Sequence, residues 1–182
     1  MSNATSQTSL INERRYSIDT CVLVDIWSGK NGLYPKEQFI GLWQRMEEMI
    51  NQGRIVAHNE VYKELKRHSN KEFLSWLAAH QAQMNCSPPG AYAQAKDIID
   101  NYLSTFKHGY RPKVSDAADP FVVALALDQD LIVFTQEKRL SNQELTQASK
   151  PKIPNVCGQY PPLECVDIKE FMEKESITLV SA

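Results

Sequence analysis

The sequence predicts an α/β fold in which a mainly parallel central sheet is flanked by helices. Short apolar segments alternate along the chain with longer segments of helical periodicity, the pattern of strands joined by helical crossovers. The 182 residues are 42% hydrophobic and 23% charged, which is enough for one compact domain with a sizeable core. No internal repeat or low-complexity linker divides the chain. We therefore expect a polar N-terminal tail at residues 1–14 and a single domain over residues 15–182.

The first expected strand is YSIDTCVLVD, residues 16–25, although its second half also suits the start of a helix. SGKNGLYP then indicates a loop. From about Pro35, the segment containing FIGLWQRMEEMI places apolar residues near helical spacing, and Gly53 is a good C-terminal cap for this helix. RIVAH, residues 54–58, predicts a short second strand.

Three helical segments follow the second strand. Asn59 suits the N-cap of the first, EVYKELKRHSN, and KEFLSWLAAHQAQM continues as the second. The SPPG break at residues 87–90 separates them from AYAQAKDIIDNYLSTF. This order of elements is consistent with helices that cover a sheet.

The C-terminal third predicts another helix, a third strand and a final helix. In DPFVVALALDQD, Asp119 is expected at the N-cap and Pro120 at the first helical position. The near-continuous apolar run at residues 131–135, LIVFT, predicts a strand buried on both faces. IKEFMEK predicts the final helix.

Composition excludes several classes of function. No apolar run approaches the roughly 20 residues that span a bilayer, and the N-terminus lacks the apolar centre of a secretory signal, so we expect a cytoplasmic protein with no membrane contact. The four cysteines form no CxxC pair, which favours reduced, packed thiols. A net charge of −2 lacks the basic excess of a protein that holds nucleic acid by charge alone, so a nucleic-acid partner would be held locally.

Four acids stand at corresponding places in this architecture: Asp19, Glu60, Asp119 and Glu137. They lie after expected strands or at helix starts, which share one edge of a parallel sheet. Like charges brought together there raise one another's pKa or require a cation among them, and oxygen ligands suit Mg²⁺ or Mn²⁺. Taken singly, Glu60 and Asp119 are ordinary residues for a helix start and Glu137 an ordinary loop acid. Asp19 is different, because neither capping nor solubility explains an acid inside a strand-like apolar segment.

Four segments, SIDTCVLVD, NEVYKEL, DPFVVALAL and IVFTQEK, resemble in this order the signature segments of the PIN-domain nucleases. KIPNVC and the later Cys165 resemble a bacterial PIN-like family known as a domain of unknown function. The resemblance runs from about Tyr16 to the final helix. It implies a three-layer sandwich with a mainly parallel central sheet.

The resemblance also implies roles for individual residues. Asp19, Glu60 and Asp119 would be the metal ligands, and Glu137 would complete the catalytic acids. Thr135 would steady the acidic group by hydrogen bonding. Asp116 is a further auxiliary acid, while Asp25 and Glu64 are auxiliaries at best, since Glu64 equally suits a surface salt bridge.

The function implied by the resemblance is divalent-metal-dependent hydrolysis of RNA phosphodiester bonds. Small bacterial PIN proteins are often toxins, so an antitoxin protein and a homodimer are expected partners beside RNA. Lys63 and Arg67 are candidates for holding substrate phosphates.

Two alternatives stay open. A phosphatase of the haloacid-dehalogenase type also begins with an aspartate after its first strand, but needs a second aspartate two residues later, where this chain has Cys21. A PIN-like module that has lost catalysis and acts through protein contacts would instead fail to bind metal.

Overall fold

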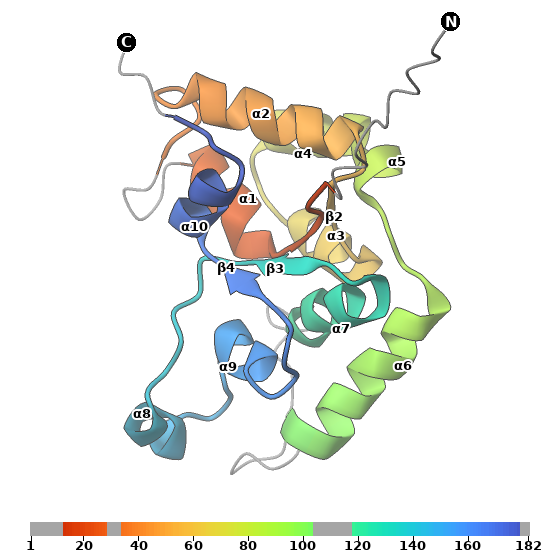
Figure 1. Ribbon diagram of the computed structural model, residues 1–182. Coiled ribbons are helices and arrows are strands. Elements are labelled where there is room, and N and C mark those ends of the chain that lie inside the picture. The colour runs from red at the N-terminus through yellow and green to blue at the C-terminus, as the bar shows by residue number, and fades with distance from the viewer. Residues whose placement is uncertain (1–12, 29–33, 104–117, 179–182) are drawn as a thin grey trace, which may run out of the picture.

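The central feature of the protein is a four-stranded parallel sheet. The computed structural model describes residues 13–28, 34–103 and 118–178. The strands are β1 (Tyr16–Ile18), β2 (Ile55–Val56), β3 (Ile132–Phe134) and β4 (Cys165–Val166), in the spatial order β2-β1-β3-β4 (Figure 1). All three strand pairings are parallel, which confirms the expected α/β fold.

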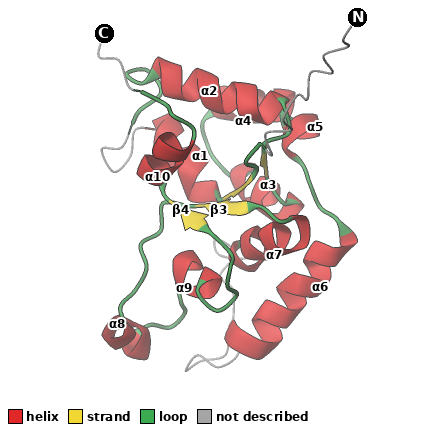
Figure 2. Ribbon diagram, in the orientation of Figure 1, coloured by secondary structure: helices red, strands yellow, loops and turns green. Residues whose placement is uncertain are grey.

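Helices cover both faces of this sheet and give three layers. Figure 2 shows α1, α2 and α10 on one side and α6, α7 and α9 on the other. The helix bounds are α1 (Thr20–Ser28), α2 (Ile40–Asn51), α3 (Asn59–Leu65), α4 (Lys71–Ala79), α5 (Gln81–Met84), α6 (Pro89–Asp97), α7 (Asp119–Gln129), α8 (Asn142–Gln147), α9 (Ile153–Cys157) and α10 (Ile168–Lys174). A π-helical segment, η2 (Ile98–Tyr102), continues α6. No helix in the described ranges is long and apolar enough to cross a membrane.

The register of the sheet brings the ends of β1 and β3 side by side. Ile18 lies opposite Phe134, and Ser17 opposite Val133. The Ser17 hydroxyl donates to the carbonyl of Val122 (2.8 Å), which fixes α7 beneath the sheet. Since all of β1 is buried, whatever follows Ile18 emerges at a fixed point beside β3.

The first strand is shorter than the sequence predicts. Its last ladder bond is donated by the Asp19 amide to the Phe134 carbonyl (2.9 Å), and the Val22 amide already donates to the Asp19 carbonyl (3.2 Å). The chain therefore turns into α1 at Thr20, and its buried residues follow helical rather than strand spacing. This turn places Asp19 at the edge of the sheet instead of inside a long strand.

Other boundaries differ from the expected ones by small shifts. His58, not Asn59, is the N-cap of α3, because its ring accepts a hydrogen bond from the Glu60 amide. Ala118 is the N-cap of α7, which puts Asp119 at the first helical position. The final helix matches IKEFMEK, and Gly53 follows α2 with φ +68°. Strand β4 and helices α8 and α9 were not expected.

The expected N-terminal tail falls largely outside the described residues, which begin at Glu13. Arg14, its last residue, donates a hydrogen bond to the carbonyl of Lys174 (2.7 Å). Arg54 pairs with Glu175 (2.7 Å), and the Tyr16 hydroxyl donates to the same carboxylate (2.7 Å). The end of α10 is thereby tied to the start of the sheet.

Aromatic stacking holds α10 against the sheet. The rings of Phe134 and Phe171 are stacked with centroids 4.4 Å apart, and Tyr16 packs edge-on against Phe171 at 5.1 Å. All three side chains are fully buried. Phe134 ends the strand that also carries the site residues described below, so this contact supports the position of that edge.

We predict that Phe171→Ala lowers the free energy of unfolding by about 3–5 kcal/mol, because it leaves a cavity against Phe134 and Tyr16. Denaturant-induced unfolding measures this change. Ile40→Ala is the control, since Ile40 is 58% exposed and should change stability by less than about 0.5 kcal/mol. Equal effects of the two substitutions would contradict the proposed anchoring.

Candidate functional site

A cleft lies at the carboxyl ends of β1 and β3. It encloses about 520 Å³ and is lined by Asp19, Thr20, Cys21, Val24, Asp25, Glu64, Asp119, Glu137, Lys150 and Lys152. Five of these side chains are acidic and two are lysines. They come from the start of α1, from α3, from the start of α7, from the segment after β3 and from the segment before α9. Residues far apart in the sequence thus meet at the sheet edge where parallel folds bind ligands.

Asp19 is the deepest of the acids, with 5% of its surface exposed. Its Oδ2 accepts hydrogen bonds from the Thr135 hydroxyl (2.7 Å) and the Cys21 thiol (2.8 Å). Burial raises the pKa of Asp19; the two hydrogen bonds oppose this shift and the charge of Glu137 adds to it. The carboxylate is oriented but lacks a cationic side chain among its described hydrogen-bond partners.

The second acid in the cleft is Glu64, not the expected Glu60. Glu64 accepts from the Thr20 hydroxyl (2.9 Å) and from the Ala118 amide (3.1 Å), and so bridges the starts of α1 and α7. Burial is the main cause that raises its pKa. Glu60 does not line the cleft and pairs instead with Lys63 on the same helix (2.6 Å).

The sequence could not separate these two glutamates, because residues four apart lie on the same helix face. The orientation of α3 decides which one reaches the cleft. The buried residues of α3 are Val61, Tyr62 and Leu65, and each glutamate directly neighbours one of them. The burial pattern therefore gives no signal that separates Glu64 from Glu60.

Asp119 reaches the cleft from the first position of α7. Since it is not the N-cap, its carboxylate makes no capping hydrogen bond and pairs with Lys150 (Oδ2 to Nζ, 2.6 Å). Burial raises the pKa of Asp119 to about 7, helped by the charges of Asp19 and Glu137 and opposed by Lys150. The negative charges of Asp19 and Glu137 thus favour the protonated form of Asp119.

Glu137 lies at the outer side of the same cleft. One of its carboxylate oxygens accepts from Lys152 Nζ (2.5 Å), and the other accepts from the Ile153 amide (2.7 Å). Its own amide donates to the Thr135 hydroxyl (3.1 Å). Thr135 therefore hydrogen-bonds to both Asp19 and Glu137; the resemblance implied that it steadies the acidic group by such bonds.

Not all expected site residues are in the cleft. Lys63, on α3, and Arg67, two residues after its end, are exposed and do not line the cleft. Asp116 lies outside the described residues. Conversely, Asp25 lines the cleft. Cys21, Lys150 and Lys152 were missed as site residues, because a thiol in a strand-like run and lysines of an expected loop do not by themselves indicate a site.

The chemistry of the donor set fits a divalent metal ion. Carboxylates and a hydroxyl are oxygen ligands, which hard ions such as Mg²⁺ and Mn²⁺ prefer. In the described part of the chain, no three acidic, histidine or cysteine side chains are gathered into a metal-binding group. Mg²⁺ is commonly held by one or two carboxylates together with water and substrate phosphate, so a complete protein cage is not required.

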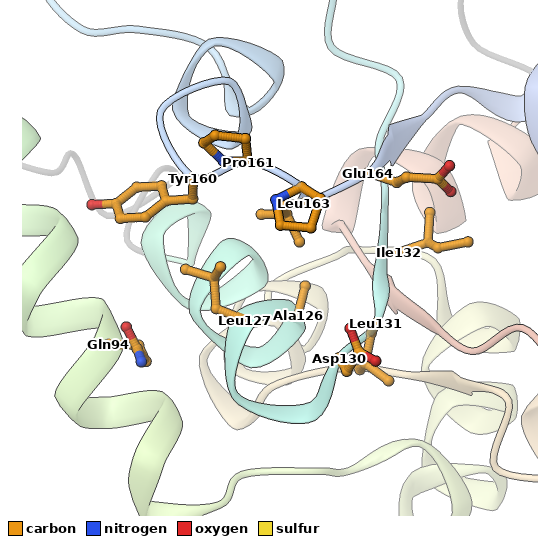
Figure 3. A pocket seen from close by; sticks show the side chains of 11 residues that line it. Gln94, Ala126, Leu127, Asp130, Leu131, Ile132, Tyr160, Pro161, Leu163 and Glu164 are labelled. Atoms are coloured by element: carbon orange, nitrogen blue, oxygen red, sulfur yellow. The ribbon is translucent and has the colours of Figure 1, made fainter.

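A second cavity, of about 570 Å³, lies at the opposite end of the sheet (Figure 3). It is formed where α7 leads into β3 and where the chain enters β4. Gln94 reaches it from α6, and Tyr160, Pro161 and Leu163 close it. Its two acids, Asp130 and Glu164, stand apart from the acidic cleft and from its lysines.

We predict that Asp119 titrates with a midpoint near pH 7 in the metal-free protein, because burial disfavours its charged form. Carboxyl-carbon NMR measures this midpoint. Its pKa in the folded state exceeds the ordinary value of 3.8, so its contribution to stability is fully present below about pH 4 and is lost as the pH rises through about 7.

Glu144 is the internal control for this titration. Hydrogen bonds from Ser141 lower the pKa of Glu144 below its usual range. An Asp119 midpoint below pH 5 would contradict the electrostatic description of the cleft.

Comparison with known proteins gives one family. Residues 16–179 match the family model described as Domain of unknown function (DUF4411). No curated protein and no solved structure matches the chain. The matched range includes every residue of the cleft. The chain therefore belongs to the DUF4411 family.

Proposed function

We propose that this protein is a divalent-metal-dependent ribonuclease that hydrolyses phosphodiester bonds of RNA. The observation that carries the proposal is the meeting of Asp19, Glu64, Asp119 and Glu137 in one cleft at the carboxyl edge of a parallel sheet. The four acids come from four separate segments of the chain. The order of the motifs, which resembles that of PIN-domain nucleases, supports the same reaction.

Structural stability alone does not account for this cluster. Burial raises the pKa values of Asp19, Glu64 and Asp119, and the charges of neighbouring carboxylates add to the shifts, which is unfavourable for folding at neutral pH. Such sites persist where a bound cation or a reaction uses them. A divalent ion here would lower the pKa of a bound water and stabilise charge on the scissile phosphate.

The residues of the chain have distinct roles in this proposal. Asp19 and Glu64 would hold the ion, since both line the cleft and both carboxylates are oriented by hydrogen bonds. Thr135 orients Asp19 and the Glu137 backbone. Asp119, with its pKa raised to about 7, is suited to accept the proton of the attacking water at neutral pH.

The biological setting is a finer part of the proposal. A toxin's role, an antitoxin partner and a homodimer rest on the resemblance of the motifs, and cytoplasmic location rests on the character of the sequence. A module that binds proteins without catalysis is the alternative, because Asp119 and Glu137 are paired with lysines rather than gathered around a single centre. Metal binding separates the two functions.

We predict that the purified protein cleaves a mixed pool of single-stranded RNA with Mg²⁺ or Mn²⁺, and that a chelator stops cleavage. Asp19→Asn and Glu64→Gln should each lower the rate by at least about 100-fold, because each removes a carboxylate held toward the cleft. The matched control is Glu60→Gln, one helical turn from Glu64, which should retain the rate of the wild-type protein. Initial rates from gel electrophoresis measure the effect.

Equal losses in Glu60→Gln and Glu64→Gln would contradict the assignment of the site. A folded wild-type protein that binds Mn²⁺ in the cleft but cleaves no RNA in the pool would contradict general RNA hydrolysis. A folded protein that neither cleaves RNA nor binds metal would favour the protein-binding module.

A further inference from the structure

Two lysines that the sequence did not single out as site residues are directed at the acids of the cleft. Lys150 pairs with Asp119 and Lys152 with Glu137. Among the described residues that line the cleft, they are the only cationic side chains. Their side chains are 24% and 39% exposed, so each ammonium group is partly accessible from solvent.

The segment that carries these lysines joins α8 to α9. The chain bends at residues 149–150 and is extended at Lys152, with φ −88° and ψ 158°. Pro151, between the two lysines, is buried. Both ammonium groups pair with acids of the cleft, while the ring between them packs inward.

The segment is fixed to the loop after β3 by a continuous set of contacts. The Ile153 amide donates to Glu137, and Arg139 donates to the Pro154 carbonyl (2.8 Å). The buried Asn155 side chain accepts from the Leu140 amide (2.9 Å) and donates to its carbonyl (2.8 Å). Each of these contacts involves a residue of the KIPN segment, residues 152–155. The contacts therefore hold in place the segment that carries the two lysines.

The same segment makes one further contact, through α9. The Cys157 thiol, at the end of α9, shares a hydrogen bond with the thiol of Cys165 in β4. The segment is thus tied to two neighbouring parts of the sheet edge. An exposed lysine on a helix surface lacks such supporting contacts, and its ammonium group is not held in one position.

The balance of charge in the cleft indicates what the lysines bind. Five carboxylates and two ammonium groups line it, so a phosphodiester entering the cleft meets strong repulsion unless cations are placed beside the acids. An ammonium group on a flexible stem is a point charge that binds phosphate oxygens well. The partial exposure of Lys150 and Lys152 lets them contact a polyanion at the cleft entrance.

We propose that Lys150 and Lys152 bind the phosphate groups of the RNA on either side of the bond that is cleaved, and that their pairing with Asp119 and Glu137 is the arrangement without substrate. This inference rests on the proposed ribonuclease function. It replaces Lys63 and Arg67 as phosphate-binding residues, since neither of those lines the cleft. In the RNA-free protein the same ammonium groups also repel a divalent ion from the neighbouring carboxylates.

The test has two measurements with opposite expected directions. In RNA-free protein, Lys150→Gln and Lys152→Gln should each bind Mn²⁺ about fivefold more tightly by titration calorimetry, because each removes a positive charge beside the carboxylates that would hold the ion. In an Asp19→Asn background, which prevents cleavage, the double substitution should weaken binding of a labelled single-stranded RNA. The slope of log affinity against log salt should fall by about 0.7 for each lysine removed.

Two further variants control for folding and for general charge. Lys150→Arg and Lys152→Arg keep the charge and should retain the salt slope of the parent. Lys96→Gln breaks another lysine–carboxylate pair, with Asp100 on α6 and η2, outside the cleft, and should change neither measurement.

The results separate this inference from the function on which it rests. If the protein with Asp19 intact cleaves RNA, but the double Gln substitution leaves the salt slope and the Mn²⁺ affinity unchanged, the lysine role is overturned and the nuclease stands. If the protein neither cleaves nor binds RNA, the proposed function and this inference both fail. Lower RNA affinity with tighter Mn²⁺ binding, and retention in the Arg variants, is the expected result.

Discussion

The hydrogen bond between the Thr135 hydroxyl and Asp19 Oδ2 is the interaction on which the site depends. It joins the residues that immediately follow β1 and β3, two strands held in register along their full length. A carboxylate at this depth is costly to bury without partners, and here it receives a hydroxyl and a thiol. The sheet edge, the turn into α1 and the direction of Asp19 are therefore set together.

The other acids are placed by elements that meet at this edge. Glu64 accepts hydrogen bonds from the Thr20 hydroxyl at the start of α1 and from the Ala118 amide at the start of α7, where unpaired backbone donors favour a carboxylate. Asp119 begins α7, and Glu137 is held by the segment before α9. The lysines of that segment offset part of the accumulated charge. The cleft thus combines buried carboxylates with two lysines that are paired with them. Bound substrate or metal would change these charge pairings.

Much of this arrangement was predictable from the sequence, for physical reasons. Alternating apolar segments predicted the parallel sheet, and an acid in a buried segment predicted Asp19 as a site residue, which the structure places in the cleft. Helical spacing predicted that Glu60 and Glu64 lie on one face of α3. It could not predict the orientation of this helix, which brings Glu64 into the cleft. The starts of α3 and α7 were each misplaced by one residue, because His58 and Ala118 act as caps in place of the stronger cap formers Asn59 and Asp119. Lys150 and Lys152 were not predicted as site residues, because they reach the cleft through contacts with acids 31 and 15 residues away in the sequence.

The central claim is that the acids at the ends of β1 and β3 form a binding site for a divalent metal ion. Crystals grown with Mn²⁺ test it most directly, because anomalous scattering locates the ion without reference to activity. The account predicts a peak in the cleft with oxygens of Asp19 and Glu64 among its ligands, and loss of that peak in Asp19→Asn crystals. A fully occupied Mn²⁺ peak elsewhere on the protein, with the cleft empty and Lys150 and Lys152 still paired with their acids, would contradict it.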